Sequence, residues 1–249
     1  MVISALVSAG ILILMYYKLD TEDKKIGGLK FIAIVTVILH YSSLWVDYLE
    51  DGEATIGSEM LFAVHPCHVL MWMLFVSSFL QKKSGNISGK IVQLMNEFLF
   101  FGGIVCGSIG IIINENFGNN PTLTDYHVLK GLLSHSTMII GCIYVLVGGF
   151  IKIRVKNLFG IIAGLSLFIV DGVIVNSIFA IAGLDTPNSM YLMEPPFANM
   201  PWLNTAVIGV AALLVGFTAT AIYEAIALPK EERWYTLLSA KIKARKEAR

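Results

Sequence analysis

The chain has 249 residues, of which 56% are hydrophobic and only 14% are charged, and its mean hydropathy is +0.72. Soluble domains are rarely this apolar, so the composition predicts an all-α polytopic membrane protein without a soluble domain. The formal net charge of zero gives no support for nucleic-acid binding. Three cysteines, all inside apolar segments, predict no disulfide framework.

Seven apolar segments are long enough to cross a bilayer as helices. They comprise residues 2–17, 28–49, 59–80, 90–113, 126–151, 158–182 and 202–227. The first lacks the basic start of a signal peptide, so we expect it to be retained as a helix. Residues 1–227 therefore form the predicted seven-transmembrane-helix bundle. Residues 228–249 are predicted to form a basic amphipathic tail that lies on anionic lipid.

Positive charges are distributed very unequally between the two sides of this predicted bundle. Of the 18 lysines and arginines, all but Lys130 lie in or beside the first, third and fifth loops or in the tail. The second, fourth and sixth loops carry acidic residues instead. The positive-inside rule therefore places the N-terminus outside and the C-terminus in the cytoplasm. We expect an integral, multi-pass protein of the plasma membrane.

The run His65-Pro66-Cys67-His68 lies inside the third apolar segment. Ionisable residues inside a membrane helix indicate a functional site, because polar groups are costly there. We expect Pro66 to distort this helix by removing a backbone hydrogen bond near Phe62. The alternative is a kinked helix whose buried histidines are bonded to neighbouring carbonyl groups.

Polar residues from four segments are predicted to lie at similar depths in the outer half of the bilayer. At 1.5 Å per residue, His40, Cys67 and His135 lie roughly 12–13 Å from the outer ends of their segments. Asp171 and Asn176 lie about 16 Å and about 9 Å from the outer end of the sixth segment. Because random placement would not favour one layer, this predicts a single interior site.

Cys67 is the best candidate nucleophile, since a thiolate attacks an acyl carbonyl readily. His135, at matching depth on another helix, is the natural base, and Asp171 or His40 could orient its imidazole. Each has a simpler explanation: Cys67 as a small buried hydrophobic residue, and His135 as an interhelical hydrogen-bonding group.

The neighbouring histidines fit two chemistries. His65 and His68 are three residues apart on one face, where they could line the pocket or donate to a developing oxyanion. With His135 and Asp171 they could instead hold zinc. Zinc-dependent seven-span lipid hydrolases draw a histidine pair from the last helix, however, and the seventh segment here has no histidine. We therefore expect no metal and no other cofactor.

Three stretches together carry a family resemblance. They are His65-Pro66-Cys67-His68, Leu133-Ser134-His135 and the outer loop Asn188-Ser189-Met190-Tyr191-Leu192-Met193-Glu194-Pro195-Pro196. Over nearly its full length the chain resembles the YwaF/transmembrane protein 164 family. The resemblance implies cysteine-dependent acyl transfer on phospholipids, with Cys67 as the acylated nucleophile and His135 as the base. A more distant similarity is to the androgen-induced seven-span lipid hydrolases, which use a threonine and a histidine.

Further residues are candidates for substrate binding. Tyr191 and Glu194 lie in a proline-rich loop suited to cap the polar layer, although an aromatic interface anchor is an equal alternative. Lys130 could take a lipid phosphate or could reach Asp125 near the surface. The sequence favours a lipid acyltransferase or hydrolase that acts on membrane phospholipid. The alternative is a non-catalytic lipid- or solute-binding receptor or transporter; the oligomeric state is not determined.

Overall fold

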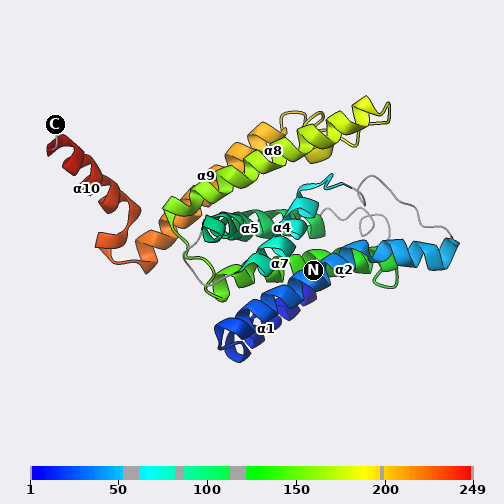
Figure 1. Cartoon of the computed structure of the whole chain (residues 1–249), viewed down its shortest axis with the longest axis horizontal. Coiled ribbons are helices and arrows are strands. Elements are labelled where there is room, and N and C mark those ends of the chain that lie inside the picture. Colours follow the sequence, from blue (N-terminus) through cyan, green and yellow to red (C-terminus); the bar gives the residue numbers. More distant parts are fainter. Residues whose placement is uncertain (1, 53–61, 82–86, 113–121, 197–198, 248–249) are drawn as a thin grey trace.

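The computed structural model describes residues 2–52, 62–81, 87–112, 122–196 and 199–247. Within these ranges every regular element is helical, as the composition predicts (Figure 1). The long helices are α1 (Val2–Lys18), α2 (Glu22–Asp51), α4 (Pro66–Leu80), α5 (Ile87–Ile112), α7 (Tyr126–Val147), α8 (Leu158–Ile181), α9 (Thr205–Ala227) and α10 (Trp234–Glu247). Three short 3-10 turns are η1 (Val155–Asn157), η2 (Ser189–Tyr191) and η3 (Lys230–Glu232).

Helix α7 lies at the centre of the bundle, where it contacts α1, α2, α4 and α5. Half of its apolar span is buried, against 11% for α9, which packs on α8 at the periphery. Helices α8 and α9 run together along one side, and α10 projects away from the bundle (Figure 1). Within the described part of the tail, η3 and α10 are helical and contain no buried residue.

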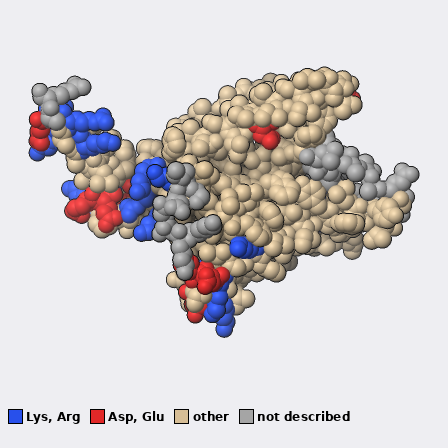
Figure 2. Space-filling view, in the orientation of Figure 1, with Lys and Arg blue, Asp and Glu red and all other residues tan. Residues whose placement is uncertain are grey.

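Each predicted apolar segment contains a helix, but the helices differ in length. Five are long and apolar enough to cross a membrane, namely α2, α5, α7, α8 with η1, and α9. The 15 residues of α4 rise by only about 22 Å, which is less than a typical hydrocarbon core. Basic side chains gather toward one end of the molecule, whereas the surface over α8 is largely uncharged (Figure 2). Seven crossings and their orientation stay predictions.

The prediction that Pro66 distorts a continuous helix was wrong. His65 is extended (φ −106°, ψ 153°) and precedes the helix, so Pro66 is its first residue. At that position the missing proline N–H costs nothing, and the fixed φ angle favours the helix. The carbonyl of Phe62 accepts from the Val64 N–H at 2.9 Å, so it is not left without a partner. Residues 59–61 of the predicted segment lie outside the described residues.

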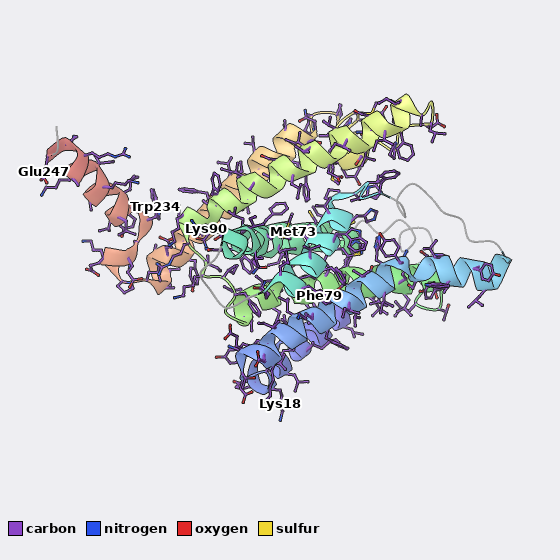
Figure 3. The ribbon with its side chains drawn as sticks, in the orientation of Figure 1. Lys18, Met73, Phe79, Lys90, Trp234 and Glu247 are labelled. Atoms are coloured by element: carbon purple, nitrogen blue, oxygen red, sulfur yellow. The ribbon has the colours of Figure 1, made fainter. Side chains whose placement is uncertain are left out.

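Helices α5 and α7 pack closely because α5 carries a row of glycines. Side chains added at Gly103, Gly107 and Gly110 would collide with Cys142, Ile139 and His135 of α7, respectively. Small residues spaced in this way let two helix backbones approach closely in a membrane. This packing fixes α7, and with it His135, against α5. Met73 of α4 is buried within the bundle (Figure 3).

Candidate functional site: a histidine cluster at the start of α4

Four of the five histidines gather where α4 begins. The ring centroids of His40 and His68 are 4.5 Å apart, and those of His65 and His68 are 5.2 Å apart. His135 lies close enough to His40 and His68 for their charges to interact. We call these four residues the histidine cluster. It joins α2, α4 and α7, as the predicted polar layer requires.

His65 and His68 form the first turn of α4 together. The His68 N–H donates to the His65 carbonyl at 2.9 Å, and the His65 N–H donates to Nδ1 of His68 at 3.5 Å. A backbone N–H can only donate, so Nδ1 of His68 is the acceptor. In a neutral imidazole the ring proton then lies on Nε2. His68, which is buried, therefore presents a hydrogen-bond donor to the cluster.

His135 has the opposite arrangement. Its Nδ1 lies 2.8 Å from the carbonyl oxygen of Gly131, one turn earlier in α7. A carbonyl oxygen can only accept, so Nδ1 carries the proton and Nε2 carries the lone pair. The Nε2 edge packs against Gly110 of α5. This hydrogen bond orients the imidazole of His135, so the orienting group is the Gly131 carbonyl rather than Asp171 or His40.

Lys130 is turned inward toward α2. Its Nζ donates to Oγ of Ser43 at 3.0 Å, and its charge reaches His40 and His135. Asp125, the surface partner considered from the sequence, caps α7 by accepting from the N–H groups of His127 and Val128. Lys130 therefore places a cation beside the histidine cluster. Ser43 was not predicted, and no periodic pattern in the sequence distinguishes it.

Cys67 is the second residue of α4, directly between Pro66 and His68. It is half-buried, packs against the hydrophobic core, and lies close enough to Cys106 of α5 for their charges to interact. The described neighbour of Cys67 is Cys106 of α5. His135 packs against Gly110 of α5 and is hydrogen-bonded to Gly131 of its own helix. The direct pairing of Cys67 with His135 stays a prediction.

The loop before α9 has an unusual backbone. Asn188, Met190 and Tyr191 all have positive φ angles, of 47°, 55° and 54°. Such angles are uncommon for residues other than glycine, and they persist only where the surroundings enforce them. The Asn188 side chain supplies part of this support, because its Oδ1 accepts from the N–H groups of Met193 and Glu194.

Neighbouring elements fasten this loop in place. Asn176 of α8 accepts from the Ser189 N–H at 2.8 Å and donates to the Ser189 carbonyl at 3.3 Å. The carbonyl of Val64 accepts from Oγ of Ser189 at 3.1 Å and from the Met190 N–H at 2.9 Å. Oγ1 of Thr205 in α9 donates to the Tyr191 carbonyl at 2.6 Å. Asn176 is thus a structural partner of the loop, and sequence reasoning missed Ser189 and Thr205.

The fastened loop delivers Tyr191 to the histidine cluster. The Tyr191 ring stacks on His65, with centroids 5.8 Å apart and planes inclined by 28°. The loop therefore contacts the start of α4 both through its backbone at Val64 and through this ring. Glu194, by contrast, is exposed, and its described bonds are made by its backbone. A role for Glu194 in substrate binding stays a prediction.

Asp171 lies in a different environment from the histidine cluster. It lines a cavity of about 230 Å³ together with the face of α4 that carries Val69, Trp72 and Met73. Its Oδ2 is buried and makes no hydrogen bond within the described part of the chain. Asp171 is the one acidic residue in the sequence of α8 (Leu158–Ile181), and the surface over this helix is otherwise largely uncharged (Figure 2). Among the described residues, no three histidine, cysteine or acidic side chains are arranged to hold a metal ion.

Comparison with protein families identifies the chain. A family model described as the TMEM164 family matches residues 1–222. The chain belongs to the TMEM164 family. The family match includes the histidine cluster, Cys67 and the loop that carries Tyr191, and it ends within α9. Comparison with curated proteins and with solved structures gives no match.

Membership of the TMEM164 family confirms the resemblance noted in the sequence. Together with the long apolar helices, it establishes the chain as an integral membrane protein.

Proposed function

We propose that this chain is a membrane-embedded enzyme that removes an acyl chain from a phospholipid and passes it to a lipid hydroxyl or to water. Cys67 carries the acyl group between the two steps. One observation supports the proposal most directly: four histidines from α2, α7 and the start of α4 gather at the turn that contains Cys67. Imidazoles are costly to bury in an apolar bundle, and a cluster of them can supply both a base and a hydrogen-bond donor.

The position of Cys67 suits a nucleophile. The first turn of a helix has unpaired N–H groups and the positive end of the helix dipole, both of which stabilise a negative charge. The thiolate is the reactive form of cysteine, so a place in this turn favours attack on an ester carbonyl.

The two hydrogen-bonding patterns divide the remaining roles. Nε2 of His135, which carries a lone pair, takes the proton of the Cys67 thiol as the sulfur bonds to the acyl carbon. The ester bond then breaks, and the departing lysophospholipid oxygen receives that proton. The Nε2–H of His68 stabilises the oxyanion of the tetrahedral intermediate. In the second step a hydroxyl group or water gives its proton to His135, attacks the thioester and releases the thiol.

The surroundings of the cluster suit a phospholipid. Lys130, held by Ser43 beside His40, offers a cation for the lipid phosphate. Tyr191 covers His65 from the outer loop and limits the entry of water to the site. In this proposal, the chain crosses the plasma membrane seven times with its N-terminus outside. The site then lies in the outer half of the bilayer.

Intact-protein mass spectrometry after incubation with phospholipid tests the proposal directly. We expect a mass increase of one acyl group, located on Cys67 and removed by hydroxylamine at neutral pH, as for a thioester. Cys67→Ala should lose the adduct completely, whereas Cys142→Ala, which changes a buried cysteine packed on Gly103, should keep it. An adduct on another residue, or none with folded protein, would exclude the cysteine mechanism and favour a non-catalytic lipid receptor or transporter.

A further inference from the structure

A second cavity lies at the other end of the bundle. It has a volume of about 280 Å³ and is bounded by the end of α1, the start of α2 and the end of α7. Figure 3 labels Lys18 at this end of α1. Lys25, which lines the cavity, precedes His40 by 15 residues of α2, a rise of about 22 Å. The cavity is therefore separate from the histidine cluster.

Tyr144 provides a buried polar group at this cavity. The side chain is only 1% exposed and lines the cavity wall, yet its hydroxyl group makes no hydrogen bond within the described residues. Buried hydroxyl groups are almost always hydrogen-bonded, because burial removes their hydrogen bonds to water and an unreplaced bond costs free energy. A ligand oxygen that reaches this hydroxyl would supply the missing partner.

The cavity carries both signs of charge. Lys25 provides a cation in the first turn of α2. Asp20 provides an anion, since the hydrogen bond from Lys24 to its Oδ1, at 2.8 Å, holds the pKa of that carboxyl below its usual range. The C-terminal end of α7 at Gly148 adds the negative end of a helix dipole.

Aromatic rings form the outer rim. Tyr16 and Tyr17 lie edge to face, with ring centroids 5.2 Å apart, and both line the cavity. They are 61% and 74% exposed, so their faces are open to a ligand. Aromatic faces attract quaternary ammonium groups, and tyrosines with an amphipathic ring suit the membrane interface.

We infer that this cavity binds the headgroup of a zwitterionic phospholipid from the leaflet at this end of the bundle. Lys25 and the Tyr144 hydroxyl bind the phosphate, while Asp20 and the two exposed tyrosine rings bind the ammonium group. The acyl chains extend along the apolar surface of α1, where Leu14 is exposed. The site is independent of the chemistry proposed for Cys67.

Native mass spectrometry of the full-length protein in detergent tests this site. Phosphatidylcholine and phosphatidylglycerol with identical acyl chains are titrated separately, and the Cys67→Ala background prevents their consumption. We expect one saturable phosphatidylcholine site. Tyr144→Phe keeps the ring and removes only the hydroxyl group, and it should weaken this binding about tenfold, the scale of one hydrogen bond to a charged group. Lys25→Ala should weaken it at least as much.

Tyr235→Phe is the matched control, because Tyr235 lies on α10 outside the cavity, and its binding should equal that of the unchanged protein. Equal or tighter binding of phosphatidylglycerol would overturn the zwitterionic assignment. Equal affinity for phosphocholine without acyl chains would assign the site to a soluble ligand instead. Unchanged phosphatidylcholine binding in both Tyr144→Phe and Lys25→Ala would show that lipid binds elsewhere.

Discussion

The two ends of the bundle hold buried polar groups in contrasting ways. At the basic end, the buried carboxylate of Glu224 accepts from the Val155 N–H at 2.6 Å through one oxygen and from the Trp234 N–H at 2.8 Å through the other. Both oxygens are occupied by backbone groups, so this residue joins α9 to η1 and α10. At the other end, His135 uses one ring nitrogen for its own helix and keeps a lone pair on the second.

The backbones of the two ends differ as well. Three non-glycine residues with positive φ angles lie within four positions near the histidine cluster, from Asn188 to Tyr191. Near Glu224, in contrast, α9 ends at Ala227 in extended backbone at Leu228. Strained backbone persists only where neighbouring groups enforce it, and it concentrates at functional sites. A fully satisfied carboxylate therefore indicates a structural joint, whereas the strained loop over partly engaged imidazoles indicates a site.

The largest expected effect concerns the base. His135→Ala should slow formation of the acyl adduct by about 100-fold or more, the usual contribution of a positioned base. Combining it with Cys67→Ala should leave no adduct, the same result as for Cys67→Ala alone, because the two residues act as a unit. Time-resolved intact-protein mass spectrometry measures both.

His127→Ala provides the control on the same helix, since His127 lies in the first turn of α7 outside the histidine cluster, and its adduct formation should be normal. A normal rate in His135→Ala would show that His135 is not the base, and His40 would become the next candidate for that role.

The second prediction concerns the packing that positions His135. Gly110→Ala places a methyl group against the imidazole, so it should destabilise the protein by about 1–3 kcal/mol and slow acylation. Gly89→Ala in the same helix meets no atom within 4 Å and should be neutral, or stabilising by up to about 1 kcal/mol. Thermal unfolding and adduct formation are measured for both. Identical behaviour of the two variants would show that this close contact does not position the ring.

A third pair of variants compares the two ends directly. Ser189→Ala removes the bond to the Val64 carbonyl, and Glu224→Gln replaces an acceptor oxygen by an amide that cannot accept. Glu224→Gln should cost about 1–3 kcal/mol, the penalty for a buried polar group left without a partner. Ser189→Ala should cost about 0.5–1.5 kcal/mol, the net contribution of one hydrogen bond, because the Val64 carbonyl still accepts from the Met190 N–H. Only Ser189→Ala should also slow adduct formation, because it loosens the loop that carries Tyr191. If both variants lose adduct formation in proportion to their loss of stability, the difference between the two ends would concern stability alone.

The smallest expected effect is that of a chelator. If the imidazoles act as acid and base, treatment with EDTA should leave adduct formation unchanged, and elemental analysis of the purified protein should find much less than one metal ion per chain. Stoichiometric zinc that is lost in His65→Ala would instead favour a metal-dependent hydrolase.

The sequence by itself determined the class of protein and the segments that form its helices. In the described part of the chain, each apolar segment found by hydropathy contains a helix, and five of these helices are long enough to cross a membrane, where a helix satisfies its backbone polar groups internally. The spacing of His40, Cys67 and His135 from the segment ends predicted a common layer, and the histidines among them do gather at the start of α4. Depth follows from the constant rise of a helix, which is a local property.

Rotation about each helix axis and the path of the loops were decided only by tertiary packing. Pro66 begins α4, and the chain just before it is held by bonds from Ser189 and Met190 to the Val64 carbonyl, which lies more than 120 positions earlier in the chain. Asp171 shares the predicted depth range, but it faces a separate cavity, since depth does not specify which side of α8 a residue occupies. The group that orients His135 is a backbone carbonyl, which every residue possesses and which no sequence pattern can distinguish.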